Sequence, residues 1–316
     1  MAFRPVRVAL VGAGRWGQIY LRNILERSDL QLVALASSRQ DAASLVPSGC
    51  LVDADWRRVL SAGGADAAII ATPPATHPEI GCFALLAGLH VLIEKPLALS
   101  SAGAAELVSA AVAARRSVFV DHIHLAHPAY RRLKAIVRSG GRISGMRGRA
   151  GNHGPYRADT SVLWDWGPHD VAMCIDLMSG PPARAYARTL DRRIVQGSVA
   201  ERVQIELMFA DAVPAEVVVS TLDDRHRLFE VDYGGKTLVY DGVGPQPLRE
   251  KGGASIPVEH ESPLSVVLTE FAQAVATGEA NIQGLRLAAD VTQVLAECDR
   301  WLQGESTGGA PSRLQQ

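Results

Sequence analysis

The order of apolar and polar positions divides the chain into two parts with different periodicities. In the first part, short apolar runs alternate with helical patterns, which is typical of a parallel sheet with crossover helices. Strands are predicted over residues 6–11, 30–36, 65–71, 91–93 and 118–120, with helices over 78–87 and 102–114 among the connections. This part therefore predicts a doubly wound α/β domain of the Rossmann type.

The second part has a helix over residues 128–137 and then changes to a β pattern. Val203, Ile205, Leu207 and Phe209 alternate with polar residues, as a half-buried strand requires. Antiparallel strands are predicted over 183–195, 202–209, 215–222, 228–233 and 237–240, a polar loop over 245–263, and helices over 263–277 and 285–303. The expected architecture is an α+β domain with a predominantly antiparallel open sheet.

These patterns set the expected domain boundaries. Residues 1–122 are predicted to form a Rossmann domain, residues 123–303 the α+β domain, and residues 304–316 a flexible tail rich in Gly, Ser, Thr and Pro. An open sheet of this kind has one face covered by helices and one face that the chain leaves uncovered. Burying the second face against another copy predicts a homodimer or homotetramer.

Composition excludes several classes of function. The 316 residues carry a formal net charge of −1, so no global field favours nucleic acid or an anionic membrane. No apolar run approaches the length of a membrane span, and no signal-peptide pattern precedes the first strand. The four cysteines are scattered without a C-x-x-C pair, which predicts neither a zinc site nor disulfides, and we expect reduced thiols in a cytoplasmic protein.

The first strand leads into a glycine motif. Gly12, Gly14 and Gly17 have the G-x-G-x-x-G spacing between an apolar strand and a helical pattern. The first glycine permits a sharp turn, the second lets a pyrophosphate approach the backbone, and the third lets the helix pack closely. The helix N-terminus then favours phosphate. We expect a dinucleotide site here, with Arg15 and Trp16 beside it; the alternative is a structural glycine turn.

The end of the second strand indicates which dinucleotide binds. An acidic residue usually occupies this place in an NAD site, where it bonds the ribose 2′-hydroxyl. This chain has Ser37, Ser38 and Arg39 instead, which suit a 2′-phosphate and predict NADP. In the alternative interpretation the segment is a polar loop with Asp41 as a cap, and backbone groups alone hold an NAD ribose.

Two more loops reach the same edge of the predicted sheet. The first contains Thr72, Pro73 and His77, and His77 either touches the cofactor or caps the next helix. The second contains Glu94 and Lys95 directly after an apolar strand. A lysine there can bond a substrate oxygen and stabilise developing negative charge, whereas the alternative is a surface Glu–Lys pair.

Three segments together resemble the glucose–fructose oxidoreductase/inositol dehydrogenase/MocA (Gfo/Idh/MocA) family: the glycine motif, ATPPATH from Ala71, and GLHVLIEKPLA from Gly88 to Ala98. The resemblance extends from about residue 6 to 302. It implies a two-domain nicotinamide-dependent oxidoreductase that acts on sugars or polyols. It also implies that Lys95 is the catalytic lysine and that the Lys95–Pro96 bond is cis, which would fix the approach of the lysine to the nicotinamide.

A second catalytic pair is predicted in the segment WDWGPHD. Asp165 and His169 are four residues apart, one turn of a helix, and can reach a common point. An imidazole can remove a hydroxyl proton, and a carboxylate can orient it. The segment also resembles the D-x-x-x-H motif of the family. The alternative is that Asp165 caps the helix and His169 packs under Trp164.

Substrate contacts are expected from both sides of an interdomain cleft. His122 and His124 would share one face of a strand, and a cleft lining is favoured over a metal pair because no third ligand is near. Basic residues that follow form either a solvated face or an anion-binding surface. The remaining predicted substrate-binding residues are Arg147, Asn152, Arg157 and Trp166.

The sequence thus predicts an NADP-dependent oxidoreductase, with NAD as the alternative cofactor and no metal. Its expected reaction interconverts a secondary alcohol and a ketone on a sugar, polyol or nucleotide-linked sugar. Two alternatives are an enzyme that cleaves glycosides with transient use of a bound nicotinamide, and a non-catalytic NADP-binding regulator.

Overall fold

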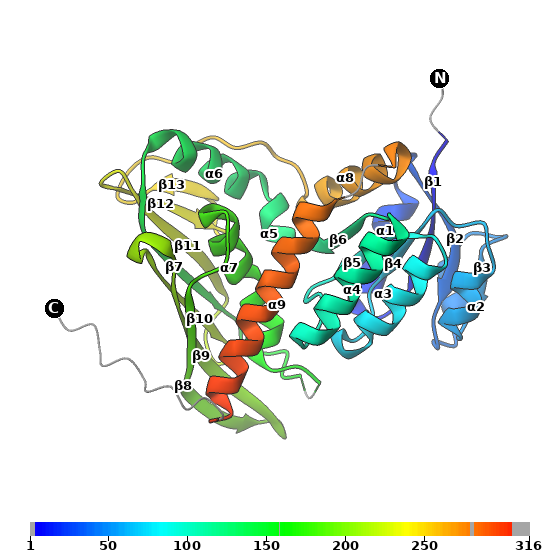
Figure 1. The fold of residues 1–316 in the computed structure, drawn as a ribbon, viewed down its shortest axis with the longest axis horizontal. Helices are drawn as coiled ribbons and strands as arrows, with labels where there is room; N and C mark the ends of the chain where they lie inside the picture. The colour runs from blue at the N-terminus through cyan, green and yellow to red at the C-terminus, as the bar shows by residue number, and fades with distance from the viewer. Residues whose placement is uncertain (1–3, 158, 279–280, 305–316) are drawn as a thin grey trace.

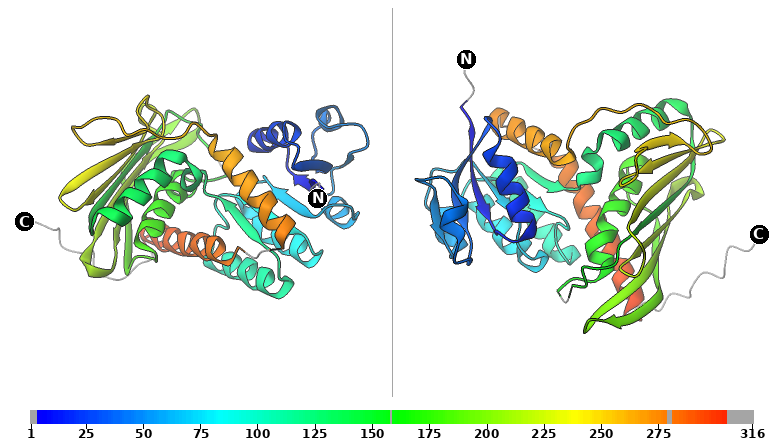
Figure 2. Two further views of the ribbon diagram at one scale, coloured as in Figure 1. Left: turned by 90° about the horizontal axis from the view of Figure 1, so that it is seen from above. Right: turned by 180° about the vertical axis from the view of Figure 1, so that it is seen from behind.

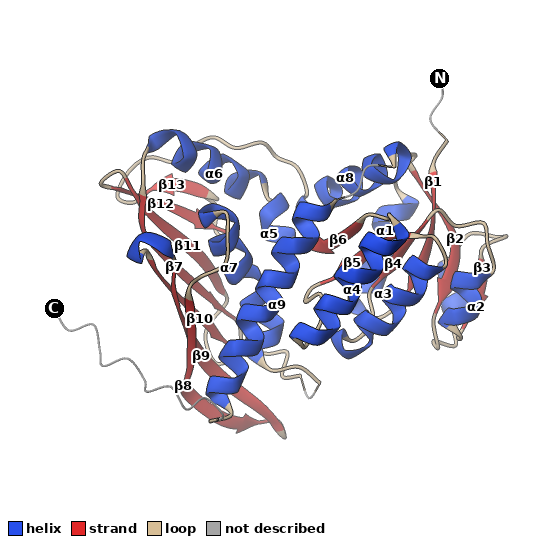
Figure 3. Cartoon of the chain, in the orientation of Figure 1, coloured by secondary structure: helices blue, strands red, loops and turns tan. Residues whose placement is uncertain are grey.

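The computed structural model describes residues 4–157, 159–278 and 281–304, which form two sheets with helices between and around them (Figures 1 and 3). The first sheet is entirely parallel, in the order β3-β2-β1-β4-β5-β6. Its strands are β1 (Val6–Val11), β2 (Leu30–Ala36), β3 (Leu51–Asp53), β4 (Ala67–Ile70), β5 (His90–Glu94) and β6 (Val118–Asp121). The helices of this part are α1 (Arg15–Leu25), α2 (Trp56–Ser61), α3 (His77–Leu86) and α4 (Ser101–Ala114).

The second sheet has the order β13-β12-β11-β7-β10-β9-β8 and is antiparallel except for the pair β7 and β10. Its strands are β7 (Ile143–Gly151), β8 (Arg184–Val195), β9 (Ser198–Met208), β10 (Pro214–Ser220), β11 (His226–Tyr233), β12 (Lys236–Asp241) and β13 (Leu248–Glu250). The remaining helices are α5 (Ile123–Ala126), α6 (Pro128–Gly140), α7 (Val162–Met178), α8 (Pro263–Thr277) and α9 (Ile282–Leu302). The predicted fold class is confirmed.

Several elements differ from the prediction. The strand β7 lies in the middle of the second sheet, where the sequence predicts a basic region, because Arg147 and Arg149 alternate with glycines and interrupt the apolar pattern of the strand. The short elements β3 and α2 were not predicted, and β13 lies within the segment interpreted as a polar loop. The predicted tail lies outside the described residues beyond Gly304.

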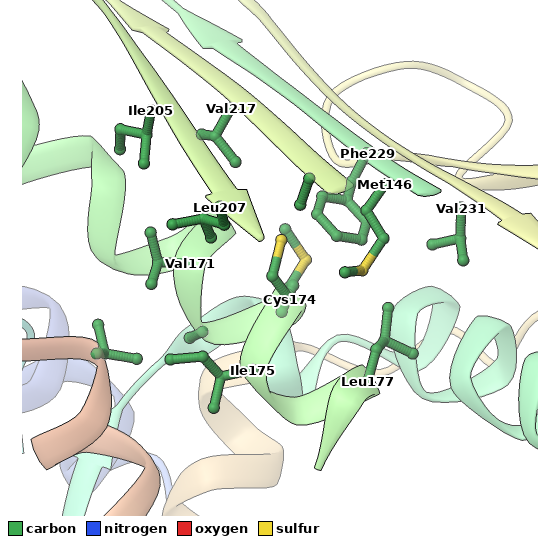
Figure 4. Packing of buried hydrophobic residues seen from close by; sticks show 14 of the residues in the cluster. Met146, Val171, Cys174, Ile175, Leu177, Ile205, Leu207, Val217, Phe229 and Val231 are labelled. Carbon is green, nitrogen blue, oxygen red and sulfur yellow. The ribbon is translucent and has the colours of Figure 1, made fainter. Parts of the chain in front are cut away.

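Buried side chains fix the position of α7, which carries the predicted Asp165 and His169. Figure 4 shows one face of α7 packed against β7, β9, β10 and β11. The contacting residues are Val171, Cys174, Ile175 and Leu177 on the helix and Met146, Ile205, Leu207, Val217, Phe229 and Val231 on the sheet. Burial of this many apolar side chains holds the helix rigidly on the sheet.

The C-terminal helices join the two parts. Phe271 of α8 packs with Phe119 of β6, with ring centroids 5.5 Å apart, in the cluster that also buries α1. In α9, Leu285 and Ala288 pack with the first domain, whereas Leu295 packs with the second. Therefore α8 and the beginning of α9 pack on the Rossmann domain, although the predicted boundary assigned residues 123–303 to the second domain.

One face of the second sheet is covered by α6, α7 and α9, and no helix of the described residues lies on the opposite face (Figure 2). Charged side chains occupy that outer face, where Arg147 pairs with Glu230 at 3.0 Å and with Asp232 at 2.7 Å. Among the helices described, none is both long and apolar enough to cross a bilayer.

Candidate active site

The glycine turn has the shape that the motif predicts. Gly12 has φ +99°, and an added Cβ would lie 2.5 Å from the Ala71 carbonyl oxygen. A Cβ on Gly17 would overlap the Gly12 carbonyl, whereas one on Gly14 would meet nothing within 4 Å. The first and third glycines are therefore needed for close packing, and the second faces open space at the N-terminus of α1. This arrangement fits a dinucleotide pyrophosphate, with Arg15 exposed and Trp16 partly exposed beside it.

The loop after β2 presents a guanidinium to solvent. The Arg39 side chain is 40% exposed and donates two hydrogen bonds to Asp41, at 2.8 and 2.6 Å. The Ser37 hydroxyl accepts a bond from the Arg39 backbone N–H at 3.2 Å. Ser38 is exposed next to them. The loop keeps both hydroxyls and the guanidinium at the carboxyl edge of the sheet, where the adenosine end of a dinucleotide would lie.

His77 bridges two loops and does not face that edge. The ring is fully buried, with Nδ1 2.8 Å from the Pro96 carbonyl oxygen and Nε2 3.0 Å from the Thr72 carbonyl oxygen. Burial lowers its pKa, so the neutral ring donates to one carbonyl at a time. The predicted cofactor contact of His77 is therefore replaced by a supporting role, while Thr72 and Pro73 stay accessible in the same loop.

Lys95 and Asp165 connect the two domains. The Lys95 Nζ donates to the Asp165 Oδ1 at 2.8 Å and to the Asp165 backbone oxygen at 2.6 Å. Their side chains are 9% and 17% exposed. Lys95 follows β5, and its bond to Pro96 is cis, as the resemblance implies. Asp165 lies in the first turn of α7.

His169 lies one turn along α7 from Asp165, as predicted, but the two side chains have different partners. The Asp165 carboxylate bonds Lys95 and lies 3.6 Å from Arg157, whereas the His169 Nδ1 is buried without a hydrogen-bond partner among the described residues. Burial, together with the charges of Lys95 and Arg227, holds the pKa of His169 well below its ordinary value. The residue as a whole is partly exposed, and its ring is neutral at neutral pH.

Two more histidines surround this ring. His124 lies edge-to-face with His169, with centroids 4.8 Å apart, and its Nδ1 is 2.7 Å from the Tyr240 hydroxyl. His122 is buried, and both of its ring nitrogens lack partners in the described structure. Burial and the Lys95 charge lower its pKa to about 4. Within the described ranges, no three His, Cys, Asp or Glu side chains are arranged to hold a metal ion.

Arg227 is a site residue that the sequence did not indicate. It is buried on β11, and its Nη1 donates to the Asp170 Oδ2 at 2.9 Å. Its guanidinium also lies 5.5 Å from the ring centroid of Trp166. Its charge reaches His124 and His169, whose pKa values it helps to lower. No motif marks an arginine at the start of a strand, so only the fold could find it.

The other predicted substrate residues fall into two groups. Arg157 is bonded to Asp159 and lies beside Asp165, and Asn152 bonds the Gly154 carbonyl oxygen in the same loop. Arg147, in contrast, lies on the outer face of the second sheet in its ion pairs with Glu230 and Asp232. The prediction that Arg147 lines the site is corrected, because neighbouring Met146 faces α7 and strand alternation turns Arg147 away.

Glu94 points into the protein beside Tyr20 and Asp121, which are not among the predicted site residues. The Tyr20 hydroxyl of α1 donates to the Asp121 carboxylate at 2.5 Å, and Glu94 pairs in register with Asp121 on the neighbouring strand. Glu94 is only 6% exposed, so it lies beneath the expected cofactor surface. The rule that parallel strands end at one edge could have predicted this acidic pair.

Comparisons with known proteins agree with this geometry. A model described as "Oxidoreductase family, NAD-binding Rossmann fold" matches residues 6–122. The crystal structure of a Magnetospirillum magnetotacticum MS-1 protein described as an oxidoreductase is 41% identical, covers 93% of this chain and 100% of its own, and has a TM-score of 0.88.

Curated proteins also match this chain. Inositol 2-dehydrogenase 4 of Saccharopolyspora erythraea is 37% identical over 145 residues, 44% of this chain and 43% of that protein. The match thus spans less than half of that relative. UDP-N-acetylglucosamine 3-dehydrogenase of Acidithiobacillus ferrooxidans is 24% identical and matches 94% of this chain and 99% of its own length.

The fold and the site define a two-domain protein with a dinucleotide-binding Rossmann domain and an α+β domain that contributes to the same site. The chain belongs to the Gfo/Idh/MocA family of oxidoreductases.

Proposed function

We propose that this protein is an NADP-dependent oxidoreductase that interconverts a secondary alcohol and a ketone on a sugar-like substrate. The observation that carries the proposal is the meeting of Lys95 from the Rossmann domain with Asp165 and His169 from α7. An ammonium and a neutral imidazole near one point are the groups that alcohol oxidation requires.

The proposed roles follow from the charge of each group. In oxidation, His169 accepts the hydroxyl proton, because its lowered pKa keeps the ring in the neutral form, which has a nitrogen lone pair free for the proton. Lys95 donates a hydrogen bond to the same substrate oxygen and stabilises its developing negative charge. Asp165 holds the Lys95 ammonium in place. The bound dinucleotide, held by the glycine turn, supplies the hydride acceptor or donor at its nicotinamide.

The preference for NADP rests on the loop after β2. The exposed guanidinium and two hydroxyls of this loop suit a phosphate. None of Ser37, Ser38 and Arg39 is the acidic residue that usually bonds the 2′-hydroxyl of an NAD ribose. Asp41 already pairs with Arg39. For a 2′-phosphate to bind, the Arg39 guanidinium must turn from Asp41 or share its donors between both groups.

We propose a polyol, keto-sugar or nucleotide-linked sugar as the substrate class. Inositol 2-dehydrogenase and UDP-N-acetylglucosamine 3-dehydrogenase are the curated relatives that support it. Arg157, Arg227 and the histidines His122 and His124 offer donors for oxygen-rich ligands. We also propose a homodimer or homotetramer that buries the uncovered face of the second sheet, and a cytoplasmic location consistent with four free cysteines.

A cofactor-coupled screen tests the proposed activity. Purified protein is mixed with NADPH or NADP⁺ and a panel of keto-sugars, inositols and nucleotide-linked sugars, and nicotinamide absorbance is followed. The proposal expects stoichiometric cofactor turnover with at least one class. Tight NADPH binding without turnover across the panel, or product formation by glycoside cleavage without net cofactor consumption, would overturn it.

A further inference from the structure

Three buried polar side chains lie directly behind Lys95 and have no place in the proposed proton transfer. They are Tyr20 on α1, Glu94 at the end of β5 and Asp121 at the end of β6. Tyr20 is fully buried, and the two acids are 6% and 2% exposed. Acidic side chains are rarely buried so completely unless a partner or a proton neutralises them.

The strand register brings the two acids together. Glu94 and Asp121 are direct partners on adjacent parallel strands, so their side chains leave the same face of the sheet about 5 Å apart at the backbone. That face is the one covered by α1 and α8, because Leu92 and Phe119, two residues earlier, pack in the same cluster as Tyr20. The surroundings are apolar, so water is kept away from the two carboxylates and does not solvate their charges.

The hydrogen bonds leave one oxygen on each acid without a partner. Tyr20 donates its single hydroxyl proton to the Asp121 Oδ2 at 2.5 Å and lies close enough to influence Glu94. The Glu94 Oε1 and the Asp121 Oδ1 are buried with no hydrogen-bond partner in the described structure. Two neighbouring carboxylates with free buried oxygens cannot both stay ionised, because their repulsion is not screened.

We propose that Glu94 and Asp121 share one proton at neutral pH, and that this proton keeps the Lys95 ammonium directed across the domain boundary at Asp165. A doubly ionised pair would carry two negative charges behind the lysine and would compete with Asp165 for its ammonium. With one proton held, the pair carries one charge, and Asp165 keeps its 2.8 Å bond. Glu94 and Asp121 are therefore positioning residues.

The charged groups around the pair support this assignment. Burial, followed by the Asp121 charge, raises the pKa of Glu94 to about 8, while Lys95 and Tyr20 oppose the rise. Burial raises the pKa of Asp121 to about 6. Arg157 from the loop after β7 interacts with Glu94 at longer range, and His122, whose pKa is lowered, contributes no charge at neutral pH.

The test uses NMR titration of the cofactor-free protein, labelled with ¹³C at the Glu side-chain carboxyl and at the Lys Cε. The Glu94 signal is assigned by its loss in Glu94→Gln, and the Lys95 signal by its loss in Lys95→Arg. In the unsubstituted protein, Glu94 should titrate with a midpoint near pH 8. The Lys95 signal should move over the same pH range.

Two substitutions should shift the Glu94 midpoint in opposite directions. Asp121→Asn removes the repelling charge and should lower the midpoint, with the Lys95 transition following it. Tyr20→Phe removes the hydrogen bond that stabilises the ionised Asp121 carboxylate, so the pair should hold its last proton more tightly and the midpoint should rise. Glu106→Gln, at an exposed position on α4, is the matched control and should leave both signals unchanged.

A Glu94 midpoint below pH 7, or one that Asp121→Asn leaves unmoved, overturns the shared proton. A Lys95 signal that ignores the Glu94 titration overturns the positioning role. The importance of the shared proton for turnover rests on the proposed function, but the titration itself needs no substrate. If no reaction is found, the proposed function fails while the titration still tests the shared proton, so the two failures can be told apart.

Discussion

The Lys95 ammonium and the Asp165 carboxylate form a 2.8 Å ion pair that joins the Rossmann domain to the first turn of α7. Both side chains are largely removed from solvent, so their attraction is stronger than that of a surface pair. The pair places the ammonium near His169, and the positive charge of the ammonium helps to lower the pKa of His169.

Asp165→Asn should lower turnover by roughly tenfold to a hundredfold, because it replaces an ammonium–carboxylate ion pair with a weaker ammonium–amide hydrogen bond. Dissociation constants for NADPH should change little. A double-mutant cycle with Lys95→Ala should be strongly non-additive, since one substitution weakens and the other removes the same contact. Additive losses of turnover would show that Asp165 acts independently of Lys95.

Arg39→Ala should weaken NADPH binding by roughly tenfold or more and leave NADH binding nearly unchanged, because only NADPH carries the 2′-phosphate. Fluorescence titration with both cofactors measures this. Arg58→Ala is a suitable control, since Arg58 is 76% exposed on α2 and lies 3.8 Å from Asp53. Tighter binding of NADH than of NADPH by the unsubstituted protein would contradict the NADP assignment.

His77→Ala should reduce the free energy of unfolding by about 1–3 kcal/mol, because one buried carbonyl, of Pro96 or Thr72, loses its donor. Chemical unfolding at pH 7 measures the loss. His260→Ala, at an exposed position, is the control. A variant with unchanged stability but greatly weakened NADPH binding would instead support direct contact of His77 with the cofactor.

His122 should make stability depend on pH. Its folded pKa of about 4 lies below the unfolded value near 6.5, so its contribution is complete above pH 6.5 and is lost as pH falls toward 4. Between pH 7 and 5 the loss from this residue is about 2 kcal/mol. His122→Gln should therefore lose correspondingly less stability over that range. An identical loss in both proteins would show that His122 does not titrate as inferred.

The sequence was sufficient where a local pattern has one physical explanation. The strands β1 and β2 and the helix α8 have the predicted bounds, because apolar runs, each interrupted by a single polar residue, and a proline at the start of the helix mark them clearly. Likewise, Gly12 and Gly17 are required by backbone overlaps that the spacing of the motif already implies.

Tertiary contacts decided what the sequence could not. The side of the sheet that Arg147 occupies depends on the register of β7, a strand whose glycines and arginines hide its periodicity. Arg227 and Tyr20 reach the site from elements distant in the chain, and no local spacing connects them to Asp170 or Asp121. Only the fold identifies Lys95 as the partner of the Asp165 carboxylate, because helical spacing alone favours His169.

The most direct test of the account is the kinetics of Lys95→Ala on a substrate from the panel. We expect a loss of turnover of roughly 10²–10⁴-fold with the NADPH dissociation constant nearly unchanged, because the ammonium acts on the substrate oxygen. Turnover close to that of the unsubstituted protein, or a loss explained entirely by weaker NADPH binding, would contradict it.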